Sequence, residues 1–135
     1  MVIKNSKEAG DIVKSLLANG GDVCQEFIRK RTDNATHIEL ISKHSNKVHY
    51  VKYSKRPFEK FGQFFPAWIG EEGESVDNDV IQRLGFNDYI YFAHPDGIHR
   101  IEMRDFIKPK LTRTTRKGDL TWSFPIGLME LFMEV

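Results

Sequence analysis

Cysteine is almost absent from this chain of 135 residues. Cys24 is the only one, so an intrachain disulfide is excluded. A cysteine-based metal site is not expected for the same reason. Cys24 lies between Val23 and Gln25 in a strand-like stretch. We therefore expect it to be a buried, inert thiol rather than a reactive one.

Long apolar runs are also missing. No stretch approaches the ~20 residues that a membrane-spanning helix needs, and the first ten residues lack the apolar core of a signal peptide. A strong charge of either sign is absent, because 20 basic and 19 acidic side chains give a net charge of +1. We expect a cytoplasmic protein without membrane contact. Only the distribution of charge along the chain can then indicate a partner.

Several enzyme motifs are lacking too. The sequence contains no H-E-x-x-H, no G-x-S-x-G and no phosphate-cradling glycine motif. All five histidines lie near two predicted hairpins: His37, His44 and His49 near the first, and His94 and His99 beside the turn of the second. We expect His37 and His49 on the strand face opposite Lys52, and His94 and His99 facing one another across a turn. Solvated or hydrogen-bonded histidines are the favoured interpretation over zinc ligands.

The sequence predicts one domain covering residues 1–135, of a size that can bury a sizeable core. A helix is predicted over 6–18, with Asn5 or Ser6 as its cap and Gly20 at its end. The other predicted elements are strands 23–30, 36–42, 47–54, 88–93, 98–106 and 120–124, and helices 75–84 and 126–133. This order, α-β-β-β-α-β-β-β-α, predicts an α+β fold with a mixed central sheet flanked by helices. Residues 57–73 and 108–117 are predicted loops.

Three side chains around the predicted 36–54 hairpin carry a recognisable pattern. Glu39 is on the first strand, Lys52 is on the second, and Glu8 is on the preceding helix. With this order of elements, residues 6–106 resemble the PD-(D/E)XK nuclease superfamily, which includes archaeal Holliday-junction resolvases and many restriction endonucleases. The resemblance implies a restriction-endonuclease-like core and, by analogy, a homodimer.

The resemblance also implies a chemistry. Two aligned carboxylates hold Mg²⁺, which lowers the pKa of a bound water and neutralises charge on the scissile phosphate. Carried over to this chain, Glu39 and Glu8 would bind the magnesium ion and Lys52 would orient or activate the water. An active member would be a magnesium-dependent endonuclease.

The motif departs from the superfamily pattern at its second acid. Tyr50 stands at that position, and a phenol with a pKa near 10 is a poor magnesium ligand. Glu39 replaces the usual Asp. The residues considered as substitute acids are Asp33 for Glu39, and Glu59 or Glu26 for the second acid. The chain is therefore either an atypical metal-dependent phosphodiesterase or an inactive derivative that binds nucleic acid.

Basic side chains gather in three stretches, 29–31, 52–60 and 108–117, whereas acids gather at 71–79. Such clusters bind phosphates by releasing counterions, and interleaved aromatic rings can stack on unpaired bases. The predicted phosphate-binding residues are Lys55, Arg56, Lys60, Arg113, Arg116 and Lys117. This distribution predicts nucleic-acid binding and leaves DNA or RNA open. The alternative is a protein–protein interaction module without nucleic acid, which would use the aromatic loop 58–69.

Overall fold

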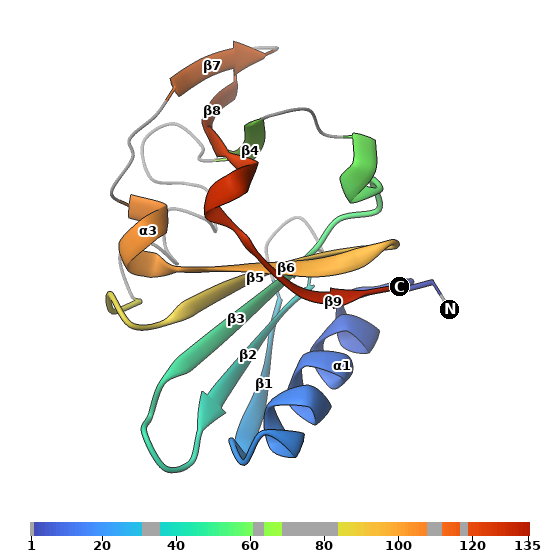
Figure 1. The fold of residues 1–135 in the computed structure, drawn as a ribbon, viewed down its shortest axis with the longest axis vertical. Helices are drawn as coiled ribbons and strands as arrows, with labels where there is room; N and C mark the ends of the chain where they lie inside the picture. The colour runs from blue at the N-terminus through green and yellow to red at the C-terminus, as the bar shows by residue number, and fades with distance from the viewer. Residues whose placement is uncertain (1, 31–35, 61–63, 69–83, 108–111, 117–118) are drawn as a thin grey trace.

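The computed structural model describes residues 2–30, 36–60, 64–68, 84–107, 112–116 and 119–135. Within these ranges the chain forms a six-stranded mixed sheet, a three-stranded antiparallel sheet and two α-helices (Figure 1). The predicted α+β class with a mixed sheet is confirmed. The predicted helix 75–84 lies outside the described residues except for Leu84, and Asp33 lies outside them as well.

Helix α1 (Ser6–Asn19) forms as the sequence predicts. The side chain of Asn5 accepts a hydrogen bond from the Glu8 amide at 2.8 Å, which satisfies one of the free donors of the first turn. The Gly20 amide donates to the carbonyls of the last turn. The buried side of the helix consists of small and aliphatic residues: Ala9, Gly10, Val13 and Leu17.

The six-stranded sheet has the order β1-β2-β3-β5-β6-β9. Its strands are β1 (Cys24–Lys30), β2 (Thr36–Ser42), β3 (Val48–Tyr53), β5 (Tyr89–His94), β6 (Gly97–Glu102) and β9 (Glu130–Glu134). Only β3 and β5 pair in parallel, and all other neighbours are antiparallel. Both hairpins that the sequence predicts, β2–β3 and β5–β6, are therefore present.

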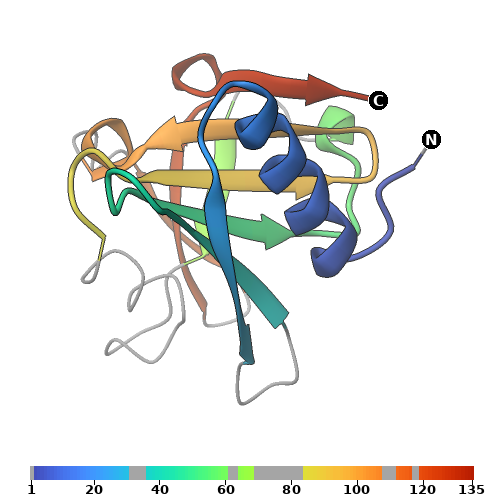
Figure 2. The same cartoon turned by 90° about the horizontal axis from the view of Figure 1, so that it is seen from below.

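Each face of this sheet carries its own core. Helix α1 covers one face (Figure 2), and the α1-side core contains Ile3, Ala9, Val13, Leu17, Cys24, Ile38, Leu40, Val51, Tyr91, Ala93 and Ile98. The far-side core contains Tyr50, Leu84, Ile90, Phe92, Ile101, Met103, Phe106 and Met129. Because strand side chains alternate between faces, Val51 and Tyr50 belong to different cores, as the sequence predicts.

Two predicted boundaries near the C-terminus are wrong. The predicted helix 126–133 is instead a short 3₁₀ turn, η3 (Ile126–Leu128), followed by strand β9. The backbone groups of β6 that β5 leaves unpaired favour this outcome, because β9 can pair with them. The predicted strand 98–106 ends at Glu102 and continues as helix α3 (Met103–Ile107). A helix places Met103 and Phe106 on one side, where both enter the far-side core.

The two predicted loops contain regular structure. The first includes η1 (Phe58–Lys60) and β4 (Phe64–Trp68), and the second includes β7 (Thr112–Arg116). Strand β8 (Asp119–Pro125) confirms the predicted strand 120–124. Strands β4 and β7 pair with the two sides of β8, which gives a sheet of order β4-β8-β7. This sheet lies across the six-stranded sheet from α1 (Figure 1). The rest of both loops lies outside the described residues.

The turn between β5 and β6 joins both ends of the described chain. The Ile3 amide donates to the Pro95 carbonyl at 3.2 Å, and the Val135 amide donates to the Asp96 carbonyl at 3.3 Å. Residues 3 and 135 are therefore held beside the same turn.

In the ranges that the structure describes, no helix combines the length and apolar character required to cross a bilayer.

Candidate functional site

Glu39 and Lys52 share one face of the sheet. Glu39 pairs directly with Tyr50 in the β2–β3 register, and Lys52 follows Tyr50 by two residues on β3. Paired residues and residues two apart on a strand point to the same face. All three side chains therefore point away from α1, which agrees with the nuclease resemblance. The catalytic roles of Glu39 and Lys52 stay predictions.

The carboxylate of Glu39 is buried and has a cationic partner. Its side chain is only 2% exposed, and Arg29 Nε lies 3.3 Å from its Oε2. A buried carboxylate needs such a charge-assisted hydrogen bond to offset its lost hydration. Arg29 reaches it diagonally, because Phe27 is the residue directly opposite Glu39. Part of the binding capacity of Glu39 is therefore committed to Arg29.

Tyr50 has an apolar environment. It is 1% exposed and packs in the far-side core with Ile90 and Phe92. The ring of His37 stacks on it, with 5.3 Å between ring centroids. The prediction that His37 lies opposite Lys52 is wrong, because β2 places His37 on the same face as Glu39. The second-acid position thus offers a buried phenol, which is a poor ligand for Mg²⁺.

The structure does not bring Glu8 and Glu39 together. Glu8 belongs to α1, which covers the other face of the sheet. The charge of Glu8 acts on Tyr53, whose pKa is raised first by burial and second by this carboxylate. Tyr53 shares the α1 side with Val51. The sheet therefore separates the two carboxylates that the resemblance assigns to one magnesium ion.

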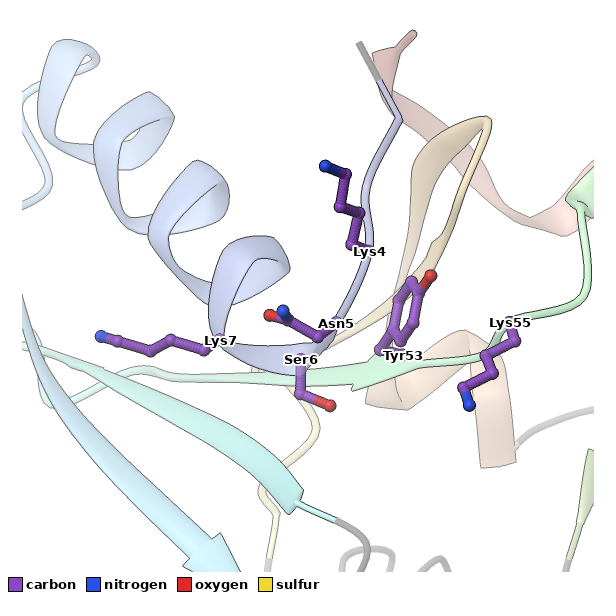
Figure 3. A pocket seen from close by; sticks show the side chains of 6 residues that line it. All are labelled: Lys4, Asn5, Ser6, Lys7, Tyr53 and Lys55. Atoms are coloured by element: carbon purple, nitrogen blue, oxygen red, sulfur yellow. The ribbon is translucent and has the colours of Figure 1, made fainter.

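A pocket lies where the end of β3 meets the start of α1 (Figure 3). It has a volume of about 350 Å³. Its lining residues are Lys4, Asn5, Ser6, Lys7, Tyr53 and Lys55. Of these, the sequence predicted only Lys55 as a phosphate-binding residue. Lys4 and Lys7 were missed because they are 48 or more positions away in sequence, and only the packing of α1 on β3 brings them close. We call this cavity the basic pocket.

The lysines of the basic pocket differ in their partners. Lys7 Nζ lies 2.6 Å from Glu26 and 2.9 Å from Asp11, and these hydrogen bonds, that of Glu26 first, raise the pKa of Lys7. No acid in the described part of the chain pairs with Lys4 or Lys55. The N-terminus of α1 adds partial positive charge at the same place. The described charges of the basic pocket are therefore mainly positive, which suits an anionic group chemically.

The other predicted phosphate-binding residues lie outside the basic pocket or outside the described side chains. Arg56 is exposed, and its carbonyl lies 2.7 Å from His94 Nδ1. The Lys52 ammonium lies 5.9 Å from the centroid of the Phe92 ring. The backbones of three predicted residues lie in η1 and β7, but their side chains are not described: Lys60, Arg113 and Arg116. Lys117 lies outside the described residues.

Comparison with known proteins places this chain in no family. No family model matches it, and neither does any curated protein or solved structure. The resemblance to nucleases therefore rests on the short motif around Glu39 and Lys52 and on the order of elements. Because one fold hosts many activities, function has to be argued from the site itself.

His94 and His99 lie on the same face of the β5–β6 hairpin, as diagonal neighbours. Both rings pack on Phe58, with centroid distances of 5.4 Å for His94 and 3.7 Å for His99. The carboxylate of Asp96 holds this arrangement by accepting hydrogen bonds from the Phe58 and Glu59 amides at 2.7 and 3.1 Å. Burial lowers the pKa of both histidines. They therefore act as neutral packing residues near pH 7.

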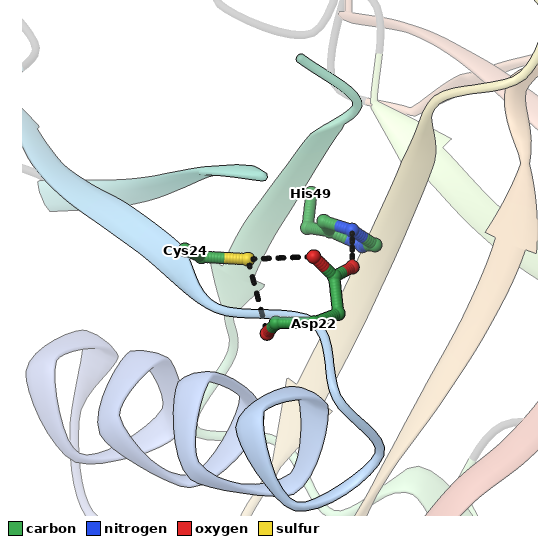
Figure 4. A group of neighbouring side chains, drawn as sticks. All are labelled: Asp22, Cys24 and His49. Atoms are coloured by element: carbon green, nitrogen blue, oxygen red, sulfur yellow. Dashed lines mark hydrogen bonds and ion pairs between the residues drawn. The ribbon is translucent and has the colours of Figure 1, made fainter. Parts of the chain in front are cut away.

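A second polar group lies under α1 (Figure 4). It consists of Asp22, Cys24 and His49, and one ligand-type atom of each lies within 4.8 Å of the other two. Cys24 is buried as expected, and burial first and Asp22 second raise the pKa of its thiol to about 11. Burial lowers the pKa of His49. No spacing in the sequence predicts this group, because Asp22 lies in a turn and β2 separates Cys24 from His49.

Proposed function

We propose that this protein binds nucleic acid through the phosphate backbone, with the basic pocket as an anchor point. The observation that carries this proposal is that two lysines of the pocket have no acidic partner among the described residues. They are Lys4 and Lys55, which line one cavity. A protein lysine that neutralises a phosphate releases bound counterions, and this release supplies much of nucleic-acid affinity.

The shape of the pocket suits a phosphate that is attached to a larger group. Ammonium groups are point-charge donors and accept any orientation of the phosphate oxygens. Tyr53 lies between Lys4 and Lys55 (Figure 3), and its hydroxyl donates to the Ile3 carbonyl at 2.7 Å, which holds the ring in place. A fixed aromatic ring beside two cations provides a surface on which a sugar or base can pack. The same chemistry serves DNA and RNA.

A nuclease-like fold is part of the proposal. The described part of the chain has a helix, then the β2–β3 hairpin and later further strands, an order similar to that of the superfamily. Glu39 and Lys52 on one face are consistent with descent from such an enzyme. We propose binding rather than cleavage, because Tyr50 is a buried phenol and the Glu39 carboxylate contacts Arg29. Magnesium is then not required.

Fluorescence anisotropy with labelled duplex, branched and single-stranded DNA and RNA tests this proposal. We expect binding that weakens as salt rises. The double variant Lys4→Gln/Lys55→Gln should bind more weakly, with a slope of log affinity against log salt that is smaller by about 2, since each lysine removes about one unit. The charge-matched control is Lys14→Gln/Lys43→Gln, which changes two lysines outside the basic pocket and should behave like the wild type.

Two results would contradict the proposal. Absence of binding at low salt would favour the interaction module that uses residues 58–69. An equal loss of affinity in the control pair would show that the basic pocket has no special role. Incubation with Mg²⁺ or Mn²⁺ tests the claim of binding without cleavage. Cutting by the wild type that is lost in Lys52→Ala would replace that claim with an active nuclease.

A further inference from the structure

The Asp22, Cys24 and His49 group lies at the opposite end of α1 from the basic pocket. The Asp22 amide donates to the Leu17 carbonyl at 2.8 Å, in the turn after the helix. Cys24 begins β1, and His49 is on β3. The side chain of Asp22 is 31% exposed, whereas that of His49 is 3% exposed. The group is therefore closed on the side of the sheet and reachable from the side of Asp22.

His49 has one ring nitrogen without a hydrogen-bond partner. Nε2 is buried and has no partner that meets the full geometry of a hydrogen bond, although it lies 3.3 Å from Oδ2 of Asp22, which is an ion-pair distance. Buried polar atoms nearly always have partners, and an unpaired one is costly. In Figure 4 the ring is directed at the Asp22 carboxylate, with Cys24 on the other side of that carboxylate. The unpaired nitrogen therefore points into the group.

The other ring nitrogen is oriented by a second residue. Nδ1 of His49 lies 2.8 Å from the hydroxyl of Tyr91, which also accepts from Arg100 Nη1 at 3.3 Å. When Nδ1–H donates to Tyr91, the lone pair of Nε2 faces the carboxylate. In that tautomer the two acceptors, 3.3 Å apart, repel unless a cation lies between them, whereas in the other tautomer Nε2–H itself faces the carboxylate. A ligand histidine in metalloproteins is typically oriented by such a hydrogen bond from its second nitrogen.

The distances and the donor types agree with a tetrahedral zinc site. Zinc bond lengths of 2.0–2.3 Å at a tetrahedral angle place nitrogen and oxygen ligands about 3.3 Å apart, and sulfur and oxygen ligands about 3.5 Å apart. The separation of His49 Nε2 from Oδ2 of Asp22 is 3.3 Å, whereas Cys24 Sγ lies 3.8 Å from the other carboxylate oxygen, Oδ1. Binding of both side chains and one carboxylate oxygen to the same ion therefore requires the Asp22 carboxylate to rotate. Thiolate and imidazole are ligands for zinc-type ions, whereas magnesium requires oxygen ligands.

We propose that Asp22, Cys24 and His49 bind one Zn²⁺ ion through a carboxylate oxygen, the Sγ thiolate and Nε2. The fourth position would hold water on the side where Asp22 is exposed. Binding releases the proton of the thiol, so affinity rises with pH. The ion would join the turn after α1 to β1 and β3. This site goes beyond the proposed nucleic-acid binding and does not depend on it.

Cobalt substitution tests the site with a spectroscopic readout. The full-length protein is treated with EDTA, dialysed and titrated with Co²⁺. We expect one equivalent to bind, with the near-ultraviolet charge-transfer band of a cobalt–thiolate bond, and Zn²⁺ to bleach that band. Zn²⁺ should also raise the midpoint of thermal unfolding, because it binds only the folded arrangement.

Single substitutions assign the ligands. Cys24→Ser should remove the charge-transfer band, and Asp22→Asn and His49→Gln should each weaken binding about tenfold or more. Tyr91→Phe should weaken it about tenfold while the band persists, since it removes only the orienting hydrogen bond. His44→Gln is the matched control, because His44 lies in the exposed β2–β3 turn, and it should bind like the wild type.

The proposal is overturned by a wild type that binds no Co²⁺, or by binding that Cys24→Ser and Asp22→Asn leave unchanged. An equal loss in His44→Gln would likewise overturn it. Circular dichroism of each variant without metal shows whether it folds. If Cys24→Ser fails to fold, Asp22→Asn decides, because Asp22 is partly exposed and the exchange preserves its shape.

Discussion

Gly10 is the residue at which α1 comes closest to the sheet. A Cβ atom at this position would lie 2.8 Å from Cγ2 of Ile38 and 2.9 Å from its Cγ1. Ile38 is fully buried and belongs to the α1-side core. A β-branched side chain has little freedom to move aside in such packing. The absence of a side chain at Gly10 therefore sets the distance between helix and sheet.

Gly10→Ala should destabilise the protein even though alanine is the better helix former. The gain in helix propensity is about 1 kcal/mol, and overpacking typically costs about 1–3 kcal/mol, so we expect a small net loss. Urea denaturation followed by circular dichroism measures it. Ser15→Ala, on the exposed side of the same helix, should be neutral or slightly stabilising. A Gly10→Ala protein more stable than Ser15→Ala would contradict this packing.

The sequence predicted the residues whose role depends on near neighbours. Asn5 caps α1, and the placement of His49 on the face opposite Lys52 was correct, since both follow from local geometry. The pairing of Arg29 with Glu39 was missed, because it depends on the register of two strands and on a diagonal contact. The side of the sheet on which Glu8 lies was missed for a similar reason, since it depends on how α1 docks.

At the scale of elements, β9 depends on a glycine in the strand beside it. A Cβ atom on Gly97 would lie 2.9 Å from the Met133 carbonyl oxygen, which is backbone and cannot rotate away. The two strands pair antiparallel, with Gly97 opposite Glu134. A side chain at residue 97 would therefore push β9 away from β6. The docking of the last strand requires glycine at this position.

Gly97→Ala should weaken that docking. We expect a loss of about 1–3 kcal/mol in stability, the usual cost of inserting an atom into close packing. Hydrogen exchange of the β9 amides should become faster, because local opening of this strand needs less free energy. Gly127→Ala is the matched control, as its Cβ would meet no atom within 4 Å. Unchanged exchange in Gly97→Ala would show that β9 tolerates the extra atom.

Local signals predicted α1 and both hairpins, whereas elements with remote partners were missed. The hairpins are closed by short turns, so the sequence contains the whole unit. In contrast, β9 pairs with β6, and β4 pairs with β8 more than fifty residues away. The apolar pattern of 126–133 suits a helix or a strand, and only the unpaired edge of β6 decides between them.

For the whole molecule, three histidines with lowered pKa values make stability depend on pH. Burial is the main cause for His49, His94 and His99. These groups are neutral in the folded protein and gain protons more readily when it unfolds. Their contribution is present above about pH 6.5, the pKa of an unperturbed histidine, and is lost as pH falls below that value. The free energy of unfolding therefore rises with pH in this range, because the unfolded state binds more protons than the folded state.

Urea denaturation in EDTA at pH 7.5 and at pH 5.5 should show this loss, with each histidine contributing at most about 1.4 kcal/mol per pH unit. EDTA removes any effect of metal at the Asp22, Cys24 and His49 group. His99→Gln should reduce the slope, because it deletes one of the three groups. A stability that rises on acidification over this range would contradict the assignment.

The general class of the molecule was predictable, but its site was predictable only in part. The order of helices and strands indicates a mixed sheet, because a parallel neighbour such as β5 needs a long connection after β3. The basic pocket combines Lys55, which the sequence predicted, with Lys4, which it did not. Residues from separate elements come into contact only when the elements pack, so their spacing in the sequence does not predict the contact.

The turn at Pro95 and Asp96 has a mechanical consequence. Because the amides of Ile3 and Val135 both attach to it, a pulling force applied at these two residues enters the sheet at one point. The force would peel β9 from β6 one backbone pair at a time, beginning at Gly97 and Glu134. Peeling loads hydrogen bonds singly, whereas shear loads a whole strand at once. Stretched in this direction, the domain should yield at low force despite its two cores.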